Sequence, residues 1–274
     1  MHYIKSLSQY SDDRKAAVTF GKFDGLHLGH QKLVNRVEEL GKKNNIPSVV
    51  CTFDMSDFWK ERHVQKKMLM SKQERYDHLN DKVDYLIDCP FTEEFRNMSA
   101  EEFIKDIIHG KFQAEYVVVG TDFRFGYNQG GDIHTLEKYS KCYGYELIVI
   151  EKERYRDRII SSTYIKELLG EGDIKLANTL LGYPFEINGT VGHGRRLGRN
   201  LGFPTLNIVW PEEKFIPPRG VYISEILLGG VRFHGISNVG VRPTVTQNQE
   251  VVLETFLFDY TGDAYEKEVK VELL

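Results

Sequence analysis

Hydrophobic and polar residues alternate with a different period in the two parts of the chain. In the first two-thirds, short apolar runs rich in β-branched and aromatic residues are separated by amphipathic stretches. This pattern is typical of an α/β fold with a parallel sheet. Right-handed crossovers would place the loops after the strands along one edge, where ligands of open α/β sheets bind. The predicted strands are Ala16–Phe20, Ser48–Phe53, Tyr85–Ile87, Tyr116–Val119 and Glu146–Ile150.

Helical periodicity disappears after the segment Gly170–Pro184, where the composition shifts. Strand-like runs separated by Gly or Pro turns follow, which predicts an antiparallel β-barrel. We therefore expect two domains, covering residues 1–180 and 184–274. The predicted barrel strands are Phe185–Val191, Thr205–Val209, Val221–Leu228, Val231–Asn238, Val251–Phe258 and Glu268–Leu273.

Composition narrows the class of protein. The chain has 274 residues, of which 41% are hydrophobic and 28% charged, with room for two modest domains. A net charge of −4 lacks the basic footprint of a nucleic-acid binder, so we expect no nucleic-acid partner. The polar N-terminus does not resemble a signal peptide, and no apolar run approaches the ~20 residues of a membrane span. We expect a cytoplasmic protein without structural disulfides, because its three cysteines are scattered.

The most informative segment is Gly21–His30, which joins the first predicted strand to a helix. Apolar residues recur at helical spacing after His30, so a helix begins near that residue. Unpaired N–H groups and the positive dipole end at such a helix start favour bound phosphate. His27 and His30 are close enough to donate to it together. The alternative is two surface histidines beside a tight turn. Other predicted phosphate-binding residues of this turn are Phe23, Asp24 and Gly25.

A second loop, Gly120–Gly126, follows the predicted strand at Tyr116–Val119 and should face the same crevice. Asp122 and Arg124 lie there between two phenylalanines. Such a set can grip a charged, planar ligand, with the rings stacking and the Arg engaging phosphate. Alternatively, Phe123 and Phe125 are core side chains that flank a solvated Arg.

A hydroxyl-rich run, Ser161, Ser162 and Thr163, opens another helical pattern and contains its N-cap. With the backbone amides of the helix start and with Lys166 one turn further on, it also forms a possible second anion cradle. Capping alone is the alternative.

A basic, glycine-rich segment lies between the first two predicted barrel strands. It suits ATP, and the Thr205 hydroxyl and the Asn207 carbonyl after it are hard oxygen ligands of the kind that Mg²⁺ accepts. A plain hairpin loop is the alternative. The predicted ATP-binding residues of this segment are Gly192, His193, Gly194 and Arg195.

These motifs resemble known families. The run Phe-Asp-Gly-Leu-His-Leu-Gly-His resembles the His-x-Gly-His signature of the nucleotidyltransferase superfamily. Together with the Asp-Phe-Arg-Phe and Ser-Ser-Thr motifs it resembles the adenylyltransferase module of bacterial bifunctional FAD synthetases. The run Gly-Phe-Pro-Thr-Leu-Asn, ending at Asn207, is similar to a riboflavin kinase motif. The segments Asn238–Thr244 and Glu254–Asp259 also match kinases, and the resemblance implies that Glu254 is the catalytic base.

The resemblance implies a Rossmann-like nucleotidyltransferase domain followed by a riboflavin kinase-like β-barrel. Its implied reactions are riboflavin to FMN in the C-terminal module and FMN to FAD in the N-terminal one, with ATP and Mg²⁺. The implied flavin-binding residues are Asp122 and Arg124.

The chain departs from this family at three places. Asp54-Met55-Ser56-Asp57 replaces the usual Glu-Pro-His-Pro, and Lys166 replaces an Arg. The chain also ends directly after a strand, so we expect a barrel that lacks the family's C-terminal helix. Three interpretations remain open: a bifunctional enzyme, an adenylyltransferase with an inactive shortened kinase module, and a non-catalytic flavin or nucleotide sensor.

Overall fold

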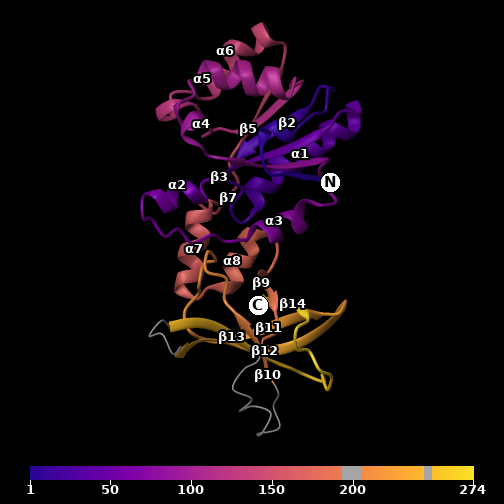
Figure 1. Cartoon of the computed structure of the whole chain (residues 1–274), viewed down its shortest axis with the longest axis vertical. Helices are drawn as coiled ribbons and strands as arrows, with labels where there is room; N and C mark the ends of the chain where they lie inside the picture. Colours follow the sequence, from indigo (N-terminus) through magenta and orange to yellow (C-terminus); the bar gives the residue numbers. More distant parts are fainter. Residues whose placement is uncertain (193–204, 244–248) are drawn as a thin grey trace. The chain divides into compact units, whose positions relative to one another are not determined.

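The computed structural model describes residues 1–192, 205–243 and 249–274 (Figure 1). The contacts divide it into two compact units. The N-terminal unit comprises Met1–Lys66 and Lys72–Ile160, and the C-terminal unit comprises Lys67–Ser71 and Ser161–Leu274. Each unit is described by itself below. This division assigns residues 161–180 to the C-terminal unit, whereas the sequence pattern groups them with the first domain; the boundary at 180–184 stays a prediction.

The N-terminal unit is built on a six-stranded parallel sheet with the strand order β1-β4-β3-β2-β5-β6. The predicted α/β architecture is confirmed. The strand β1 was not predicted, because its three residues lie in a polar N-terminal stretch. The strands are β1 (His2–Ile4), β2 (Ala17–Gly21), β3 (Ser48–Asp54), β4 (Tyr85–Pro90), β5 (Tyr116–Gly120) and β6 (Glu146–Ile150).

Helices pack on both faces of this sheet because successive strand residues point to opposite sides. Ala17 and Val118 pack with α1 (Leu28–Asn44) on one face. Val18 and Phe20 belong to a larger aromatic-rich cluster on the other face, which includes the π-helix η2 (Phe103–Lys111). The further helices are η1 (Leu7–Gln9), α2 (Ser56–Glu61), α3 (Lys72–Leu79), α4 (Glu93–Asn97), α5 (Ala100–Glu102), η3 (Tyr127–Gln129) and α6 (Ile133–Tyr143). A small hairpin, β7 (Arg154–Tyr155) and β8 (Arg158–Ile159), follows β6.

The strand order changes direction between β2 and β5. From β2 the chain proceeds through β3 to β4 on one side, and β5 and β6 extend the sheet on the other. In open α/β sheets a crevice forms outside the carboxyl ends of the strands at such a switch point. The turn after β2 and the loop after β5 are therefore neighbours at this edge.

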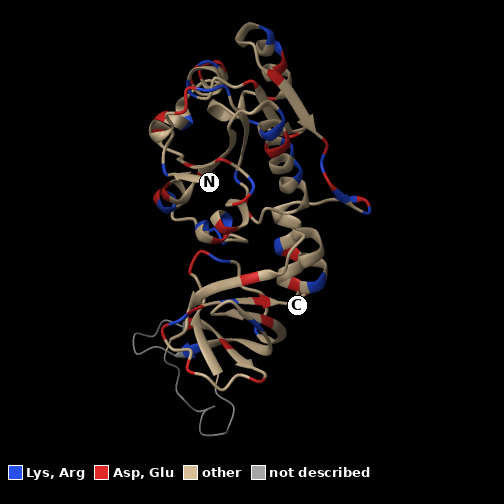
Figure 2. Cartoon of the chain, turned by 90° about the vertical axis from the view of Figure 1, so that its right-hand side faces the viewer, with Lys and Arg blue, Asp and Glu red and all other residues tan. Residues whose placement is uncertain are grey.

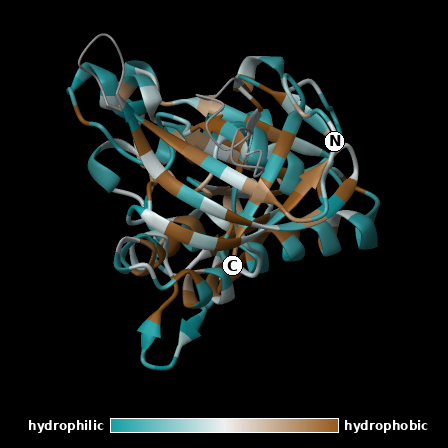
Figure 3. Cartoon of the chain, turned by 90° about the horizontal axis from the view of Figure 1, so that it is seen from below, coloured by the Kyte–Doolittle hydropathy of each residue, from teal (hydrophilic) through white to brown (hydrophobic). Residues whose placement is uncertain are grey.

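The C-terminal unit contains an antiparallel six-stranded sheet with the order β10-β13-β12-β11-β14-β9. Its outer strands approach each other where the N–H of Gly192, just after β9, donates to the Asn207 carbonyl of β10 at 2.8 Å. The sheet is thus curled as a half-barrel, as expected. Its strands show bands of hydrophobic and polar residues (Figure 3). They are β9 (Phe185–Thr190), β10 (Thr205–Val209), β11 (Gly220–Leu228), β12 (Val231–Pro243), β13 (Gln249–Leu257) and β14 (Glu268–Leu273).

Two helices precede this sheet, α7 (Ser162–Glu171) and α8 (Ile174–Leu181). The predicted helix after Ser161 is confirmed as α7, but α8 was not predicted. Acidic and basic residues are interspersed over the helices and strands of both units (Figure 2). Among the described residues, no helix is both long and apolar enough to cross a membrane.

Candidate active sites

The turn that leads from β2 into the start of α1, residues 22–30, is called the histidine turn below. It is tight and largely buried. Phe23 is fully buried and adopts a φ of 46°, and Leu26 adopts a φ of 37°. Positive φ values at non-glycine residues carry strain, which clusters at functional sites. Gly25, at φ 86°, takes a conformation that a residue without Cβ adopts readily. The backbone of this turn is held in a specific shape and brings the two histidines to the helix start.

The two imidazoles lie against each other at the start of α1. Their ring centroids are 3.8 Å apart and their planes differ by 19°. His27 is the N-cap of α1, since its Nδ1 accepts the amide N–H of His30 at 3.4 Å. A neutral His27 therefore carries its proton on Nε2, where it can donate to a ligand. The alternative of two unrelated surface histidines does not fit, because His27 is only 6% exposed.

Gly29 explains the middle of the His-x-Gly-His motif. A Cβ at this position would lie 3.3 Å from both Cε1 and Nδ1 of His27. A side chain at residue 29 would therefore push on the imidazole, so the glycine makes room for the ring at the helix start.

Both histidines are uncharged at neutral pH. Burial lowers the pKa of His27 to about 4, although the Asp24 carboxylate opposes this shift. Burial, with the charges of His27 and Arg75, lowers the pKa of His30 well below its usual range. Desolvation disfavours the charged imidazolium. Each ring can thus offer one N–H to a phosphate while the helix start supplies backbone amides.

The loop after β5 approaches the histidine turn through its aromatic residues. Phe123 stacks on Phe20 of β2 with a centroid separation of 6.2 Å. Phe125 is buried in the core, which corrects the picture of two rings free to grip a ligand. Arg124 is exposed and donates to the Phe123 carbonyl at 3.2 Å, as in the alternative of a solvated Arg between core rings.

Asp122 is exposed and pairs with Lys152 at 2.6 Å. Lys152 follows β6, the neighbour of β5, so sequence reasoning missed a cation at this edge of the sheet. No local motif marks this lysine, and only the strand order brings it to Asp122.

The residues Ser161–Lys166 are placed in the C-terminal unit. Ser161 is the N-cap of α7, and its hydroxyl accepts the N–H of Tyr164 at 3.2 Å. The capping role is therefore present. Whether Ser161, Ser162, Thr163 and Lys166 share a ligand with the histidine turn stays a prediction.

A second group of predicted residues meets on one face of the C-terminal sheet. Asn207 of β10 and Asn238 of β12 are both directly opposite Glu254 of β13. Directly opposed residues of antiparallel strands project to the same face. Thr205, two residues before Asn207, lies on this face as well. The sheet register thus brings Thr205, Asn207 and Glu254 together, although they lie far apart in the sequence.

Glu254 and Asn238 are exposed, and Thr205 and Asn207 are half-buried. The Asn207 amide donates to the Thr205 carbonyl at 3.3 Å, which leaves the side-chain oxygen of Asn207 as an acceptor. Gly192 is bridged directly to Asn207. The other predicted residues of the glycine-rich segment, His193, Gly194 and Arg195, lie outside the described residues. Clusters of three or more His, Cys, Asp or Glu side chains that could hold a metal are absent from the described part of the chain.

Comparisons with known proteins match the two parts of the chain to different family models. A family model of FAD synthetase matches residues 9–164, and one of riboflavin kinase matches residues 181–274. The riboflavin kinase match covers the whole C-terminal sheet, so a kinase module is present. That this module lacks the family's C-terminal helix stays a prediction.

Curated relatives match nearly the whole chain. A bifunctional riboflavin kinase/FMN adenylyltransferase of Buchnera aphidicola subsp. Schizaphis graminum is 37% identical over 280 residues, covering 100% of this chain and 87% of that protein. The protein of the same name from Escherichia coli K12 is 34% identical over 275 residues, covering 98% of this chain and 86% of that protein. A crystal structure titled as a macrolide-efflux protein from Streptococcus pneumoniae has a TM-score of 0.87 and 28% identity, covering 100% of this chain and 89% of that one.

Proposed function

Because the chain belongs to the family of bifunctional riboflavin kinase/FMN adenylyltransferases, we propose that it makes FAD from riboflavin in two ATP-dependent steps. The C-terminal unit phosphorylates riboflavin to FMN, and the N-terminal unit adenylylates FMN to FAD. The observation that supports this proposal is that each unit brings predicted site residues together: the His27–His30 pair at the start of α1, and Asn207 opposite Glu254 on β10 and β13.

In the adenylylation, an FMN phosphate oxygen attacks the α-phosphorus of ATP, and pyrophosphate leaves. Phosphoryl chemistry of this kind depends on positioning and on charge stabilisation. His27 and His30 donate to the triphosphate from the helix start, with Phe23, Asp24 and Gly25 shaping the turn. Asp122 and Arg124 hold FMN. Ser161, Ser162, Thr163 and Lys166 contribute further phosphate contacts.

In the phosphorylation, the riboflavin hydroxyl oxygen attacks the γ-phosphorus of ATP, the Glu254 carboxylate accepts the hydroxyl proton, and ADP leaves. Gly192, His193, Gly194 and Arg195 contact ATP. The Thr205 hydroxyl and the Asn207 side-chain oxygen are hard oxygen donors on one face, a pair that suits Mg²⁺. When bound there, Mg²⁺ neutralises phosphate charge. The substrates are small molecules, and a cytoplasmic location stays a prediction.

The test supplies the purified chain with Mg²⁺ and ATP, adds riboflavin in one reaction and FMN in another, and separates the flavins by chromatography. FAD in both reactions is the expected result. FAD from FMN alone would favour the adenylyltransferase with an inactive kinase unit, and no product in either reaction would favour the non-catalytic sensor.

A further inference from the structure

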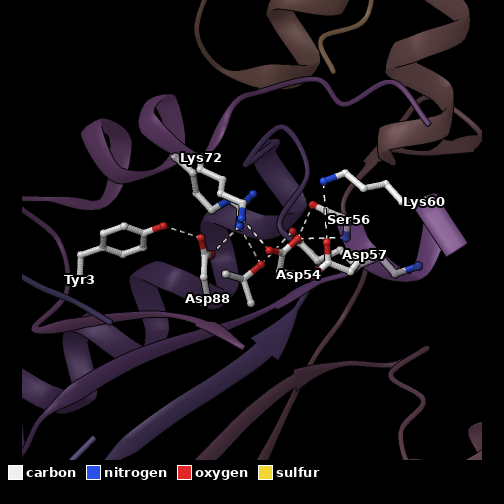
Figure 4. A network of polar contacts seen from close by, with 10 residues as sticks. Tyr3, Asp54, Ser56, Asp57, Lys60, Lys72 and Asp88 are labelled. Atoms are coloured by element: carbon white, nitrogen blue, oxygen red, sulfur yellow. Dashed lines mark hydrogen bonds and ion pairs between the residues drawn. The ribbon is translucent and has the colours of Figure 1, made fainter. Parts of the chain in front are cut away.

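A chain of buried polar side chains lies beside the histidine turn, at the carboxyl ends of β3 and β4. Figure 4 shows the Tyr3 hydroxyl directed at Asp88, at a distance of 2.6 Å. The Asp88 carboxylate also accepts from Arg75 of α3 at 3.1 Å. Arg75 in turn donates to the Thr52 hydroxyl at 2.9 Å. All three of Thr52, Arg75 and Asp88 are buried.

The direction of each hydrogen bond in this chain follows from its donors. A guanidinium nitrogen can only donate, so the Thr52 hydroxyl accepts from Arg75 and keeps its own proton. With that proton, the Thr52 hydroxyl donates a hydrogen bond to the backbone carbonyl of Lys22, 3.2 Å away. The chain therefore runs from α3 through β3 and ends on the backbone of the histidine turn.

The Lys22 carbonyl lies at the start of the strained part of this turn. Thr52 stands beside Gly21 in the register of β2 and β3, and Phe23, with its positive φ, follows Lys22 directly. A hydrogen bond at this point resists relaxation of the backbone. It thereby fixes where His27 and His30 begin the helix.

Burying Arg75 and Asp88 is costly, since both charges leave water. Arg75 has in addition a buried Nε without a hydrogen-bond partner. A merely structural role would be served as well by apolar residues of similar volume. The buried Nδ1 of His30 has no hydrogen-bond partner, and the pKa of His30 is lowered first by burial, then by the charges of His27 and Arg75. These features indicate a role at the histidines.

We propose that Arg75 and Thr52 are positioning residues, which hold the histidine turn in the geometry needed for FMN adenylylation. The inference rests on the proposed function of the N-terminal unit. Both residues lie outside the His-x-Gly-His motif. Thr52 contacts the histidine turn directly through its hydroxyl, and Arg75 acts on the turn through Thr52.

The first test replaces Thr52 by Val, which keeps the shape and removes the hydroxyl. Thr19 of the neighbouring β2 offers a matched control, because it is also fully buried and its hydroxyl has no partner. We expect Thr52→Val to lower kcat for FAD formation about tenfold to a hundredfold, with KM nearly unchanged, as for a loss of positioning. Thr19→Val should retain kcat, and Thr52→Ser should restore it. Equal kcat values in Thr52→Val and Thr19→Val would overturn the inference.

Riboflavin phosphorylation by the same variants reports on the other unit and should stay at the wild-type rate. If wild type forms no FAD from FMN, the proposed function fails; if wild type is active and Thr52→Val matches it, only the positioning role fails. Should Thr52→Val not fold, Tyr3→Phe replaces it, with Tyr85→Phe as its control, since Tyr85 donates to Asp12 in the same unit. Equal kcat for these two variants would also overturn the inference.

A readout independent of activity is the NMR titration of His30. The titratable or charged groups that act on its ring are His27, from the same turn, and Arg75, from α3. Burial is the main reason why the pKa of His30 is low, and the charges of His27 and Arg75 lower it further. Arg75→Gln should therefore raise the pKa of His30 by a small amount, whereas Thr19→Val should not move it. An unmoved His30 titration in Arg75→Gln would show that the guanidinium does not act on the histidine turn.

Discussion

The two units hold their predicted site residues in place by different means. These residues are the histidine turn in the N-terminal unit and the Asn207–Glu254 row in the C-terminal unit. The turn is buried, its backbone is strained at Phe23 and Leu26, and burial lowers the pKa of His27 to about 4. In the row, Glu254 is exposed and Asn207 is half-buried, and the strand register aligns the two residues. We infer that the first site depends on the packing around it, whereas the second depends mainly on the side chains in the row.

The largest expected effect concerns the packing of the turn. Gly29→Ala would place a methyl group against the His27 ring, 3.3 Å from its Nδ1. We expect FAD formation from FMN to fall about a hundredfold, because small displacements of positioning groups have effects of that size. The control Gly170→Ala changes a glycine of α7 whose added Cβ makes only ordinary contact. Comparable rates in the two variants would contradict the tight fit of His27.

In the C-terminal unit, loss of a side chain from the row should act through the lost ligand atom more than through packing. Asn207→Ala removes a proposed Mg²⁺ ligand and should lower riboflavin phosphorylation by roughly tenfold to a hundredfold. Val209→Ala, on the same strand and 54% exposed, is the control and should have no effect. Initial rates at several Mg²⁺ concentrations measure this. A rate for Asn207→Ala that equals wild type at every concentration would remove Asn207 from the site.

The two sites should also differ in their response to acid. The folded-state pKa of His27 is depressed, so the unfolded chain binds the proton first as the pH falls below about 6.5. The contribution of neutral His27 to the free energy of unfolding is therefore fully present above that pH and is lost as the pH falls towards 4. The loss between pH 7 and pH 5 is roughly 2 kcal/mol. Urea unfolding of the N-terminal unit at these two pH values measures the loss. His27→Gln should show a smaller loss, and an equal loss would contradict the assignment.

The smallest expected effect is at Lys166, which replaces the Arg that the family usually carries. Lys166→Arg restores a bidentate fork for phosphate. We expect KM for ATP in adenylylation to fall about twofold to threefold, with riboflavin phosphorylation unchanged. A change in the kinase reaction instead would place Lys166 at the other site.

Local patterns in the sequence predict much of this molecule. Strands β6, β10 and β14 have the predicted bounds, and the spacing of glycine and histidine after β2 is enough to locate the tight turn that leads into α1. These features are local, since periodicity, caps and turns involve residues a few positions apart.

Features that depend on distant residues were missed. Nothing near Arg75 in the sequence shows that α3 places it beside Thr52 and Asp88, because buried charges on a helix look like a solvated face. The sequence likewise leaves open whether Phe125 stacks on a ligand or lies in the core, and only the core cluster around Phe103 settles its burial. Such partners are chosen by tertiary packing.

A crossed assay of His30→Ala and Glu254→Gln decides whether two separate sites carry the two reactions. Each variant is supplied with riboflavin or FMN, together with ATP and Mg²⁺. We predict that His30→Ala forms FMN from riboflavin but little FAD, and that Glu254→Gln forms FAD from FMN but no FMN from riboflavin. Loss of both reactions in either folded variant, or wild-type rates in both variants, would contradict the two-site assignment.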